Sequence, residues 1–383
     1  MCPSPQIVFF KFRSFSQINQ HVLRELQKGF PGATVLSIDV DRDLVAVRSL
    51  QNLFHVLKLY GMDFLRQKRS LRAEFSSRTI LVRTPYYYQQ VKRAVAKWNS
   101  GRKIWFSFQT QSLFDTSTRG IPHFIYTDHT HLANLRYPGF DSHTLFSPEW
   151  IHLEKEAYHN AALIFTTAEF TSQSLVEDYG IPEQRIYCVH SGVNVDVPDR
   201  DLKRDYASKN ILFVGVEWER KGGPDLVETF CSLLLQHPNA RLTIVGCSPQ
   251  IDHPNTHVVG RVPLQEMPAY YQDASVFCLP SRVEPSASAL TEAAAFGLPV
   301  VSTRIGGTPQ RVLHGETGYL IEPGDQKGLK AALSELLSDP VKCQTFGERG
   351  RQLVHENFSW DVVGQKICGH IRDWLTYHGR SNI

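Results

Sequence analysis

Two glutamates eight positions apart, Glu284 and Glu292, stand where an apolar run gives way to an alanine-rich one. The run 274–281 stops at a proline and predicts a buried strand, and the run 293–296 ends at Gly297 and predicts a helix. Glu284 would then lie at the carboxyl end of a strand, the edge of an open α/β sheet where ligands bind. A glutamate there can accept hydrogen bonds from two sugar hydroxyls, and charge-assisted bonds are the stronger kind. The alternative is structural: Glu284 is solvated, and Glu292 caps its helix or pairs with a cation.

A pair of cations, Arg220 and Lys221, follows the apolar run 211–215 and precedes two glycines and a predicted helix. Backbone N–H groups at a helix N-terminus attract anions, and the two side chains add positive charge, so this loop predicts a phosphate site. It is neither a P-loop nor a dinucleotide fingerprint, because GxxxxGK[ST] and GxGxxG are absent. A polar loop with exposed cations is the alternative. The later pair Gly306-Gly307 allows either a close backbone approach to a ligand or a tight turn.

The elements that must position these residues alternate between strand and helix. In the first half, strands are expected at 7–10, 33–38, 79–82, 104–108, 123–127, 162–166 and 186–190, and helices at 15–28, 147–160 and 170–179. A polar stretch, 196–210, predicts a linker. Beyond it, strands are expected at 211–215, 242–246, 257–260, 274–281 and 298–302, and helices at 225–236, 267–273, 327–337, 341–356 and 360–376, with a hairpin-like connection at 315–320. The alternation predicts the α/β class, with two doubly wound parallel sheets and a ligand cleft between them.

The composition is that of a globular protein: 42% of the 383 residues are hydrophobic and 21% are charged. This length suggests two domains. No apolar run approaches the ~18 residues that span a bilayer, and the N-terminus lacks the layout of a signal peptide. The seven cysteines have neither metal nor redox spacing. A cytoplasmic protein without a bound metal is therefore expected.

The net charge of +3 hides a basic region, residues 58–103, with twelve Lys/Arg and two acidic residues. The region is either a solvated helical face or a patch that faces anionic lipid or an anionic acceptor. The second interpretation adds peripheral contact with the inner face of a membrane. No nucleic-acid-binding motif accompanies the charge, so nucleic acid is not an expected partner.

Several short motifs follow one another in a fixed order in the second half of the chain. They are Gly215 after a strand, Arg-Lys-Gly at 220–222, Pro-Ser at 280–281, Glu-x7-Glu at 284–292, Gly-x-Pro-Val-Val at 297–301, Gly-Gly-x-Pro at 306–309 and Gly-x-Thr-Gly-Tyr-Leu at 315–320. This order resembles the C-terminal domain of the retaining glycosyltransferases of family 4, which have the GT-B fold. The strong match runs from about residue 211 to about residue 339, and the turn at 358–360 is also similar. The first half matches mainly in its strand–helix rhythm.

The resemblance implies two Rossmann-like domains that face each other across a cleft. Residues 1–198 would form the acceptor-side domain and residues 199–358 the nucleotide-sugar domain. Residues 359–383 would form a helix that packs back on the first domain.

The resemblance also implies roles for the residues at matching positions. Lys221, aided by Arg220, would hold the donor's diphosphate. Glu284 would contact the transferred sugar and Glu292 the ribose hydroxyls. In the first domain a histidine usually faces the reacting sugar; His129 is the first candidate, and an ungapped reading from Pro122 places Asp128 there instead. The other donor-binding positions implied are Gly222, Arg261, Val262, Ser286, Ala287, Ser288, Gly306 and Gly307.

The implied activity is transfer of a sugar, a hexose or a related one, from a nucleoside-diphosphate sugar to an acceptor hydroxyl with retention of anomeric configuration. The acceptor would be a glycan, a lipid-linked molecule or a small molecule. No acidic DxD-type pair stands in a loop suited to bind a metal, so metal independence is expected, and no cofactor beyond the donor substrate is expected. Two other functions stay open: a nucleotide-sugar epimerase or phosphorylase on the same scaffold, and a nucleotide-sugar-binding protein without turnover. The second alternative is suggested by Val216 and by the segment 285–287, where the family usually has an arginine and x-Phe-Gly.

Overall fold

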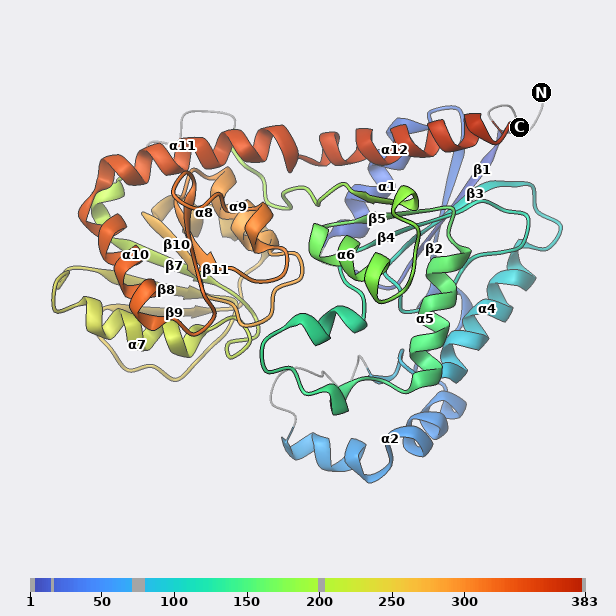
Figure 1. The fold of residues 1–383 in the computed structure, drawn as a ribbon, viewed down its shortest axis with the longest axis horizontal. Coiled ribbons are helices and arrows are strands. Elements are labelled where there is room, and N and C mark those ends of the chain that lie inside the picture. Colours follow the sequence, from blue (N-terminus) through green and yellow to red (C-terminus); the bar gives the residue numbers. More distant parts are fainter. Residues whose placement is uncertain (1–3, 15–16, 71–79, 199–203, 381–383) are drawn as a thin grey trace. The chain divides into compact units, whose positions relative to one another are not determined.

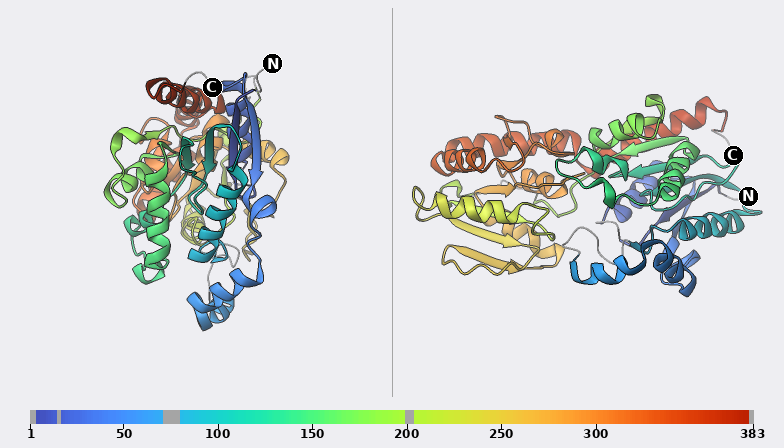
Figure 2. Two further views of the ribbon diagram at one scale, coloured as in Figure 1. Left: turned by 90° about the vertical axis from the view of Figure 1, so that its right-hand side faces the viewer. Right: turned by 60° about the horizontal axis from the view of Figure 1, so that its bottom comes forward.

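The computed structural model describes residues 4–14, 17–70, 80–198 and 204–380. Contacts within the chain divide it into two compact units, Met1–His190 with Val363–Ile383 and Ser191–Val362. Each unit contains a six-stranded sheet in which neighbouring strands run parallel, with helices on both faces (Figure 1, Figure 2). The predicted α/β class with doubly wound parallel sheets is confirmed.

The first unit has the strand order β2-β1-β3-β4-β5-β6. Its strands are β1 (Gln6–Lys11), β2 (Thr34–Asp39), β3 (Ile104–Thr110), β4 (His123–Thr127), β5 (Leu163–Thr166) and β6 (Ile186–Cys188). Its helices are α1 (Ile18–Gly29), α2 (Leu50–Ser70), α4 (Pro85–Asn99), α5 (Pro148–Asn160), α6 (Glu169–Glu177) and most of α12 (Trp360–Tyr377).

The second unit has the order β12-β11-β10-β7-β8-β9. Its strands are β7 (Asn210–Val214), β8 (Arg241–Val245), β9 (Thr256–Gly260), β10 (Val276–Leu279), β11 (Val300–Thr303) and β12 (Gly318–Ile321). Its helices are α7 (Gly223–Leu233), α8 (Met267–Asp273), α9 (Ser288–Ala295), α10 (Gln326–Ser338) and α11 (Pro340–Asn357).

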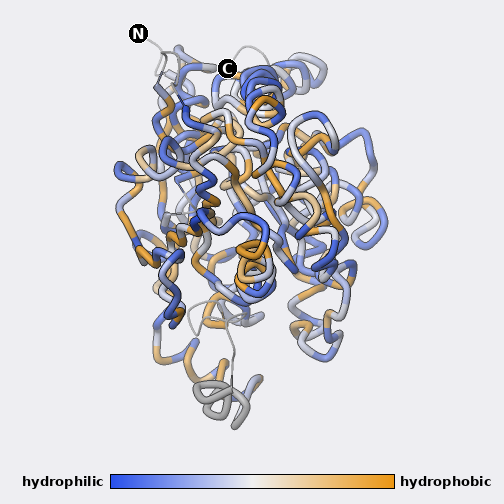
Figure 3. Tube along the Cα trace, turned by 90° about the vertical axis from the view of Figure 1, so that its left-hand side faces the viewer, coloured by the Kyte–Doolittle hydropathy of each residue, from blue (hydrophilic) through white to orange (hydrophobic). Residues whose placement is uncertain are grey.

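Neighbouring residues of β4 face opposite sides of the first sheet, as the two-residue period of a strand requires. Ile125 belongs to a buried cluster with Tyr158 of α5 and Leu175 of α6. Phe124 meets Trp374 of α12 edge to face, with 5.7 Å between ring centroids. The strand is therefore apolar on both faces because helices cover both, as is usual for parallel sheets. The helices themselves alternate between hydrophobic and hydrophilic segments along the trace (Figure 3).

Helix α12 packs against α1 of the first unit. A Cβ added at Gly364 would lie 2.6 Å from the Cβ of Glu25, so only glycine allows this approach. The Sγ of Cys368 lies 3.6 Å from the carbonyl oxygen of Glu25, and Arg372 donates a hydrogen bond of 3.1 Å to the carbonyl of Gly29. The first unit resumes at Val363, whereas the domain boundary expected from the sequence was residue 359.

The sequence also predicted a boundary after residue 198 and a linker at 196–210, of which residues 199–203 lie outside the described part. The contacts divide the units at His190 and Ser191. Residues Tyr206–Ser208 form a short 3-10 helix, and β7 begins at Asn210.

Two expectations about local structure are wrong. Residues 80–82 of the expected strand 79–82 form a helical end and a turn, and residue 79 lies outside the described part. Their side chains are buried in a cluster with Tyr87 and Val91 of α4. The residues are apolar because they are buried, and a short apolar run does not by itself distinguish a strand from other buried structure. The expected hairpin-like connection at 315–320 contributes β12, which pairs in parallel with β11. A Cβ at Gly318 would lie 1.9 Å from the carbonyl oxygen of Val300, so glycine permits this pairing.

Candidate functional site

The strand order of the second sheet reverses between β7 and β10. From this point β8 and β9 follow on one side, and β11 and β12 on the other. Ligands of open α/β sheets bind at the carboxyl ends of the strands where the order reverses. The loops that leave β7, β10 and β11 at this edge carry Lys221, Glu284 and Gly306. The structure thus brings three separate predicted segments to one place.

Gly222 allows the loop after β7 to lie directly against the loop after β10. Its φ of 73° falls in the left-handed region, and a Cβ would lie 1.9 Å from the carbonyl oxygen of Pro280. Any other residue would clash with that backbone. The close approach places Lys221 beside Glu284, at the start of α7, where backbone N–H groups favour an anion.

Lys221 and Glu284 form a buried ion pair, with side chains that are 13% and 5% exposed. Burial alone would raise the pKa of Glu284, but the positive charges of Lys221 and Arg220 outweigh it and hold that pKa below its ordinary value. Burial lowers the pKa of Lys221, and Glu284 opposes that change. An ammonium group has three donors, so a lysine that gives one to Glu284 keeps others for a ligand.

The carboxylate of Glu284 is held from three directions. Besides Lys221, it accepts hydrogen bonds from the hydroxyl of Ser281 at 3.2 Å and from the backbone N–H of Ala287 at 2.9 Å. Ala287 has a φ of 52° at the N-cap of α9, a conformation that is costly for a residue with a side chain. The backbone carbonyl of Glu284 also accepts from the N–H of Gly307 at 3.0 Å. These bonds fix the orientation of a carboxylate that the sequence analysis assigned to the sugar.

Glu292 lies on α9, the helix that follows the loop of Glu284, and is also buried. Its carboxylate accepts a hydrogen bond of 2.9 Å from the hydroxyl of Tyr271. Burial raises the pKa of Glu292 to about 7, although hydrogen bonds from Tyr271 and Asn194 lower it. Glu284 is therefore not solvated, and Glu292 lies within α9 and not at its cap. The hydrogen bond from Tyr271 holds the carboxyl of Glu292 in a fixed position, where it can accept a further hydrogen bond.

The other residues of the predicted donor site fall into two groups. Arg220 donates to Glu217 and, at 2.7 Å, to the carbonyl of Val283, so its guanidinium joins the loops after β7 and β10. Gly306 has a φ of 53°, which a turn at this point requires. Gly222, Ser286, Ala287, Ser288, Glu292, Gly306 and Gly307 all lie in the loops or helices that follow β7, β10 and β11. Arg261 and Val262 follow β9, which β7 and β8 separate from β10 in the sheet.

Arg311 was not predicted as a site residue, yet it lies buried among predicted ones. Its guanidinium donates hydrogen bonds to the hydroxyls of Ser286 at 3.3 Å and Thr291 at 2.8 Å. It also lies over the ring of Phe358, 5.1 Å from its centroid. The only sequence signal was its place just after Gly306-Gly307, since burial of a lone arginine cannot be read from a sequence.

In the first unit, Asp128 and His129 follow β4 at its carboxyl end, and both are half-buried. The Nε2 of His129 lies 3.1 Å from the side-chain oxygen of Asn134, and its ring is parallel to that of Phe170 at 6.3 Å. The backbone carbonyl of Asp128 accepts a hydrogen bond of 2.9 Å from Thr171. Neighbouring residues therefore hold both His129 and Asp128 in place, and these contacts do not decide which of the two faces the sugar.

Glu154 forms hydrogen bonds with the loop that follows β4. This buried carboxylate on α5 accepts from the hydroxyls of Tyr179 and, at 2.8 Å, Ser112, and from the backbone N–H of His131 at 3.3 Å. Burial raises the pKa of Glu154 to about 7, and the hydrogen bonds oppose it. No motif in the sequence singles out Glu154.

Comparison with known proteins gives the chain a family. A sequence model described as Glycosyl transferases group 1 matches residues 208–339, and one described as Glycosyltransferase Family 4 matches residues 71–197. A GDP-mannose-dependent phosphatidylinositol monomannoside mannosyltransferase of Mycolicibacterium smegmatis is 32% identical over 39% of this chain and 44% of its own length. Glycogen synthase of Mycobacterium tuberculosis is 35% identical over 40% of either chain. The chain thus spans less than half the length of these two relatives.

Solved structures match over nearly the whole chain. Sucrose-phosphate synthase of Thermosynechococcus elongatus has a TM-score of 0.70 at 17% identity, and the match covers 97% of this chain and 100% of that one. HepE of Anabaena, solved with UDP and glucose, has a TM-score of 0.64 at 13% identity, with 96% and 100% covered. At these identities the likeness shows the fold alone, two Rossmann-like domains of the GT-B type. With the motif order and both matched models, it follows that the chain belongs to the group 1 glycosyltransferases of family 4.

Proposed function

We propose that this protein transfers a sugar, a hexose or a related one, from a nucleoside-diphosphate sugar to an acceptor hydroxyl with retention of anomeric configuration. The observation that carries the proposal is the buried Lys221–Glu284 pair, which Gly222 sets at the carboxyl ends of β7 and β10. A cation beside a helix N-terminus suits a diphosphate, and a fixed carboxylate beside it suits sugar hydroxyls. Family membership supports this assignment.

Each residue then has a role in the proposed reaction. Lys221 and Arg220 neutralise the charge that develops on the leaving nucleoside diphosphate. Glu284 holds the transferred sugar, and Glu292 accepts from the ribose hydroxyls. His129 or Asp128 contacts the reacting sugar from the first unit. Because the two cations do the work that a metal does in other transferases, we propose that the reaction needs neither a metal nor a cofactor.

A polar cavity of about 300 Å³ in the first unit suits the acceptor. It opens at the carboxyl end of β1 and is lined by Lys11, Arg13, Asn19 and Asp39, among others. Asp39 faces Lys11 at 3.4 Å, so charges of both signs are present. This lining fits a glycan, the head of a lipid-linked acceptor or a small polar molecule.

A panel of donors tests the proposal. UDP-, GDP- and ADP-linked hexoses are added to the protein, and thermal stability and sugar transfer are followed with and without EDTA. One donor is expected to raise the melting temperature, because a ligand that binds only the folded state stabilises it. That donor should be turned over equally with EDTA present; lost turnover would contradict metal independence. Binding without turnover would favour a nucleotide-sugar-binding protein, and interconversion of the free donor an epimerase.

We also propose peripheral contact with an anionic membrane through the first half of α2, from which a cytoplasmic location at the inner membrane face would follow. Leu50, Phe54 and Leu57 recur at helical spacing and are 85%, 65% and 46% exposed, next to the exposed Lys58. An apolar helix face beside basic residues is suited to the lipid interface. Part of the basic region, 71–79, lies outside the described residues. No helix among those that the structure describes is long and apolar enough to cross a membrane.

Sedimentation with vesicles tests this contact. We expect binding to vesicles of phosphatidylcholine with phosphatidylglycerol and little binding to phosphatidylcholine alone, since each basic residue near an anionic surface adds about 1 kcal/mol. Phe54→Glu should abolish the binding, whereas Val341→Glu, at an exposed apolar residue of the second unit, should not. Equal binding to both vesicle types would contradict an electrostatic contact.

A further inference from the structure

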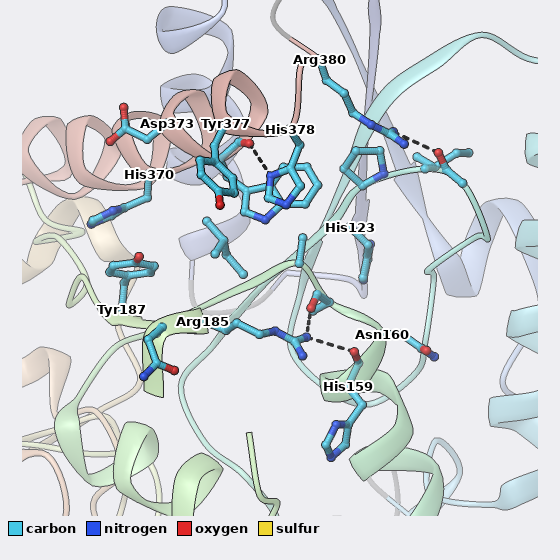
Figure 4. A pocket seen from close by; sticks show the side chains of 18 residues that line it. His123, His159, Asn160, Arg185, Tyr187, His370, Asp373, Tyr377, His378 and Arg380 are labelled. Carbon is cyan, nitrogen blue, oxygen red and sulfur yellow. Dashed lines mark hydrogen bonds between the residues drawn. The ribbon is translucent and has the colours of Figure 1, made fainter. Parts of the chain in front are cut away.

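The first unit has a second cavity, of about 830 Å³, at the edge of its sheet opposite to Asp128 and His129. Its walls come from the segments that precede β4, β5 and β6 and from the last turns of α12 (Figure 4). Asp128 and His129 follow the carboxyl end of β4, whereas this cavity lies at the amino ends of the strands. No role in the proposed transfer reaction accounts for it.

Aromatic rings from α12 and β6 dominate one wall of this cavity, here called the α12 pocket. Tyr187 stacks on His370 at 3.7 Å between ring centroids, and Trp374 stacks on His378 at 3.9 Å. Tyr377 belongs to the same wall and is 87% exposed. Figure 4 shows the rings of Tyr187, His370, Tyr377 and His378 around the cavity. Flat apolar faces with polar edges are suited to a ligand that is itself apolar on its faces and polar at its rim.

The polar groups of the α12 pocket offer both donors and acceptors. Arg185 is half-buried and donates from one nitrogen to the carbonyls of Tyr158, His159 and Ala161, which leaves the other N–H groups of its guanidinium available. Arg380 donates to a backbone carbonyl at 3.1 Å. The two arginines and the carboxylate of Asp373 leave little net charge among these groups.

A neutral imidazole, that of the buried His123, is among the groups that line the pocket. Burial lowers the pKa of His123 to about 4, so the ring is uncharged at neutral pH. Its Nδ1 lies 2.9 Å from the hydroxyl of Ser107. Among the described residues, Nε2 has no hydrogen-bond partner, and a buried polar group left without one destabilises the fold unless something satisfies it. A hydroxyl suits either tautomer, because it can donate or accept.

We propose that the α12 pocket binds carbohydrate at a site separate from the reaction centre. A sugar ring has an apolar C–H face, which stacks on Tyr377, and hydroxyls at its rim, which bond to groups such as Arg185. A phosphate fits less well, because the carboxylate of Asp373 lies among the lining groups and opposes it. The volume is within the range of about 300–1,000 Å³ that is usual for ligand sites.

Ligand-observed NMR with the full chain tests the proposal, independently of any transfer activity. The probes are maltoheptaose, an α-1,6-linked mannan oligosaccharide and cellohexaose, with UDP in excess to occupy the donor site. We expect one of them to bind, and Tyr377→Ala to weaken it at least about tenfold, while Tyr377→Phe keeps the ring and most of the affinity. Leu235→Ala, at an equally exposed apolar residue of the second unit, is the control.

Three outcomes would overturn the proposal. They are the absence of binding for all three oligosaccharides, equal affinity in Tyr377→Ala, and displacement of the bound sugar by inorganic phosphate, which would make the pocket an anion site. Tyr377 lies in the last turn of α12 and is exposed, so its replacement leaves the core untouched. Transfer to a short acceptor should be unchanged in the same variant.

Discussion

Lys221→Met is expected to lower kcat/KM for sugar transfer by roughly a thousandfold, because the removal of one preorganised group that stabilises developing charge costs about 10²–10³. It should also lower the free energy of unfolding. Lys221 is the ion-pair partner of Glu284, and a buried carboxylate left alone costs about 3–5 kcal/mol. The measurements are initial rates with the donor identified by the panel, and urea unfolding.

The double variant Lys221→Met with Glu284→Gln separates these two effects. It removes both charges, so it should recover most of the lost stability without recovering transfer. The matched control is Arg282→Ala, which breaks the ion pair between the exposed Arg282, in the loop after β10, and Asp225 in the first turn of α7, and should cost at most about 1 kcal/mol. Wild-type rates in Lys221→Met would remove Lys221 from the donor site. Lost transfer in the single variant and its return in the double one would show that only stability was at stake.

The sequence was informative where a local rule decides the structure. The strand 123–127 was predicted with the bounds that β4 has, because the apolar run is short and its ends are polar. The helix α4 was overlooked although its signal is local. Thr84 accepts from the N–H of Tyr87 at 3.1 Å and Pro85 follows, which is a usual helix start. That omission left the apolar residues 80–82 to be read as a strand.

The candidate site was predictable as a set of residues but not as an arrangement. Motif order pointed to Lys221 and Glu284 separately, but their ion pair joins residues 63 positions apart, and it depends on the approach of Gly222 to Pro280. No local sequence pattern predicts such a contact.

The role of the basic region 58–103 could not be predicted from the sequence for the same reason. Among its described side chains, Arg83 lies over the ring of Phe146 and Lys92 pairs with Asp115. These two cations therefore contact their own unit and not a partner.

Stability at different pH is expected to follow two buried carboxyls, Glu154 in the first unit and Glu292 in the second. Burial raises the pKa of each to about 7 from an ordinary value of 4.5. Below pH 4.5 both carboxyls are protonated in the folded and the unfolded chain alike. Between pH 4.5 and 7 the unfolded chain releases these protons while the folded chain keeps them, so the free energy of unfolding falls as the pH rises. The loss approaches about 3 kcal/mol for each carboxyl and is complete once the pH passes the folded pKa.

Glu154→Gln and Glu292→Gln remove this titration one unit at a time. Relative to the wild type, each variant should become more stable by about 3 kcal/mol as the pH rises from 5 to 8, as measured by urea unfolding. Glu335→Gln is the control: hydrogen bonding to Lys342 lowers the pKa of this exposed carboxyl, so it is ionised in both states from pH 5 to 8 and the difference from the wild type should hardly change there. A difference that stays constant with pH would mean that the carboxyl is ionised throughout. In that case Glu154 would carry a negative charge beside the backbone N–H of His131 at every pH tested. Glu292 would likewise be ionised before the ribose of a donor binds.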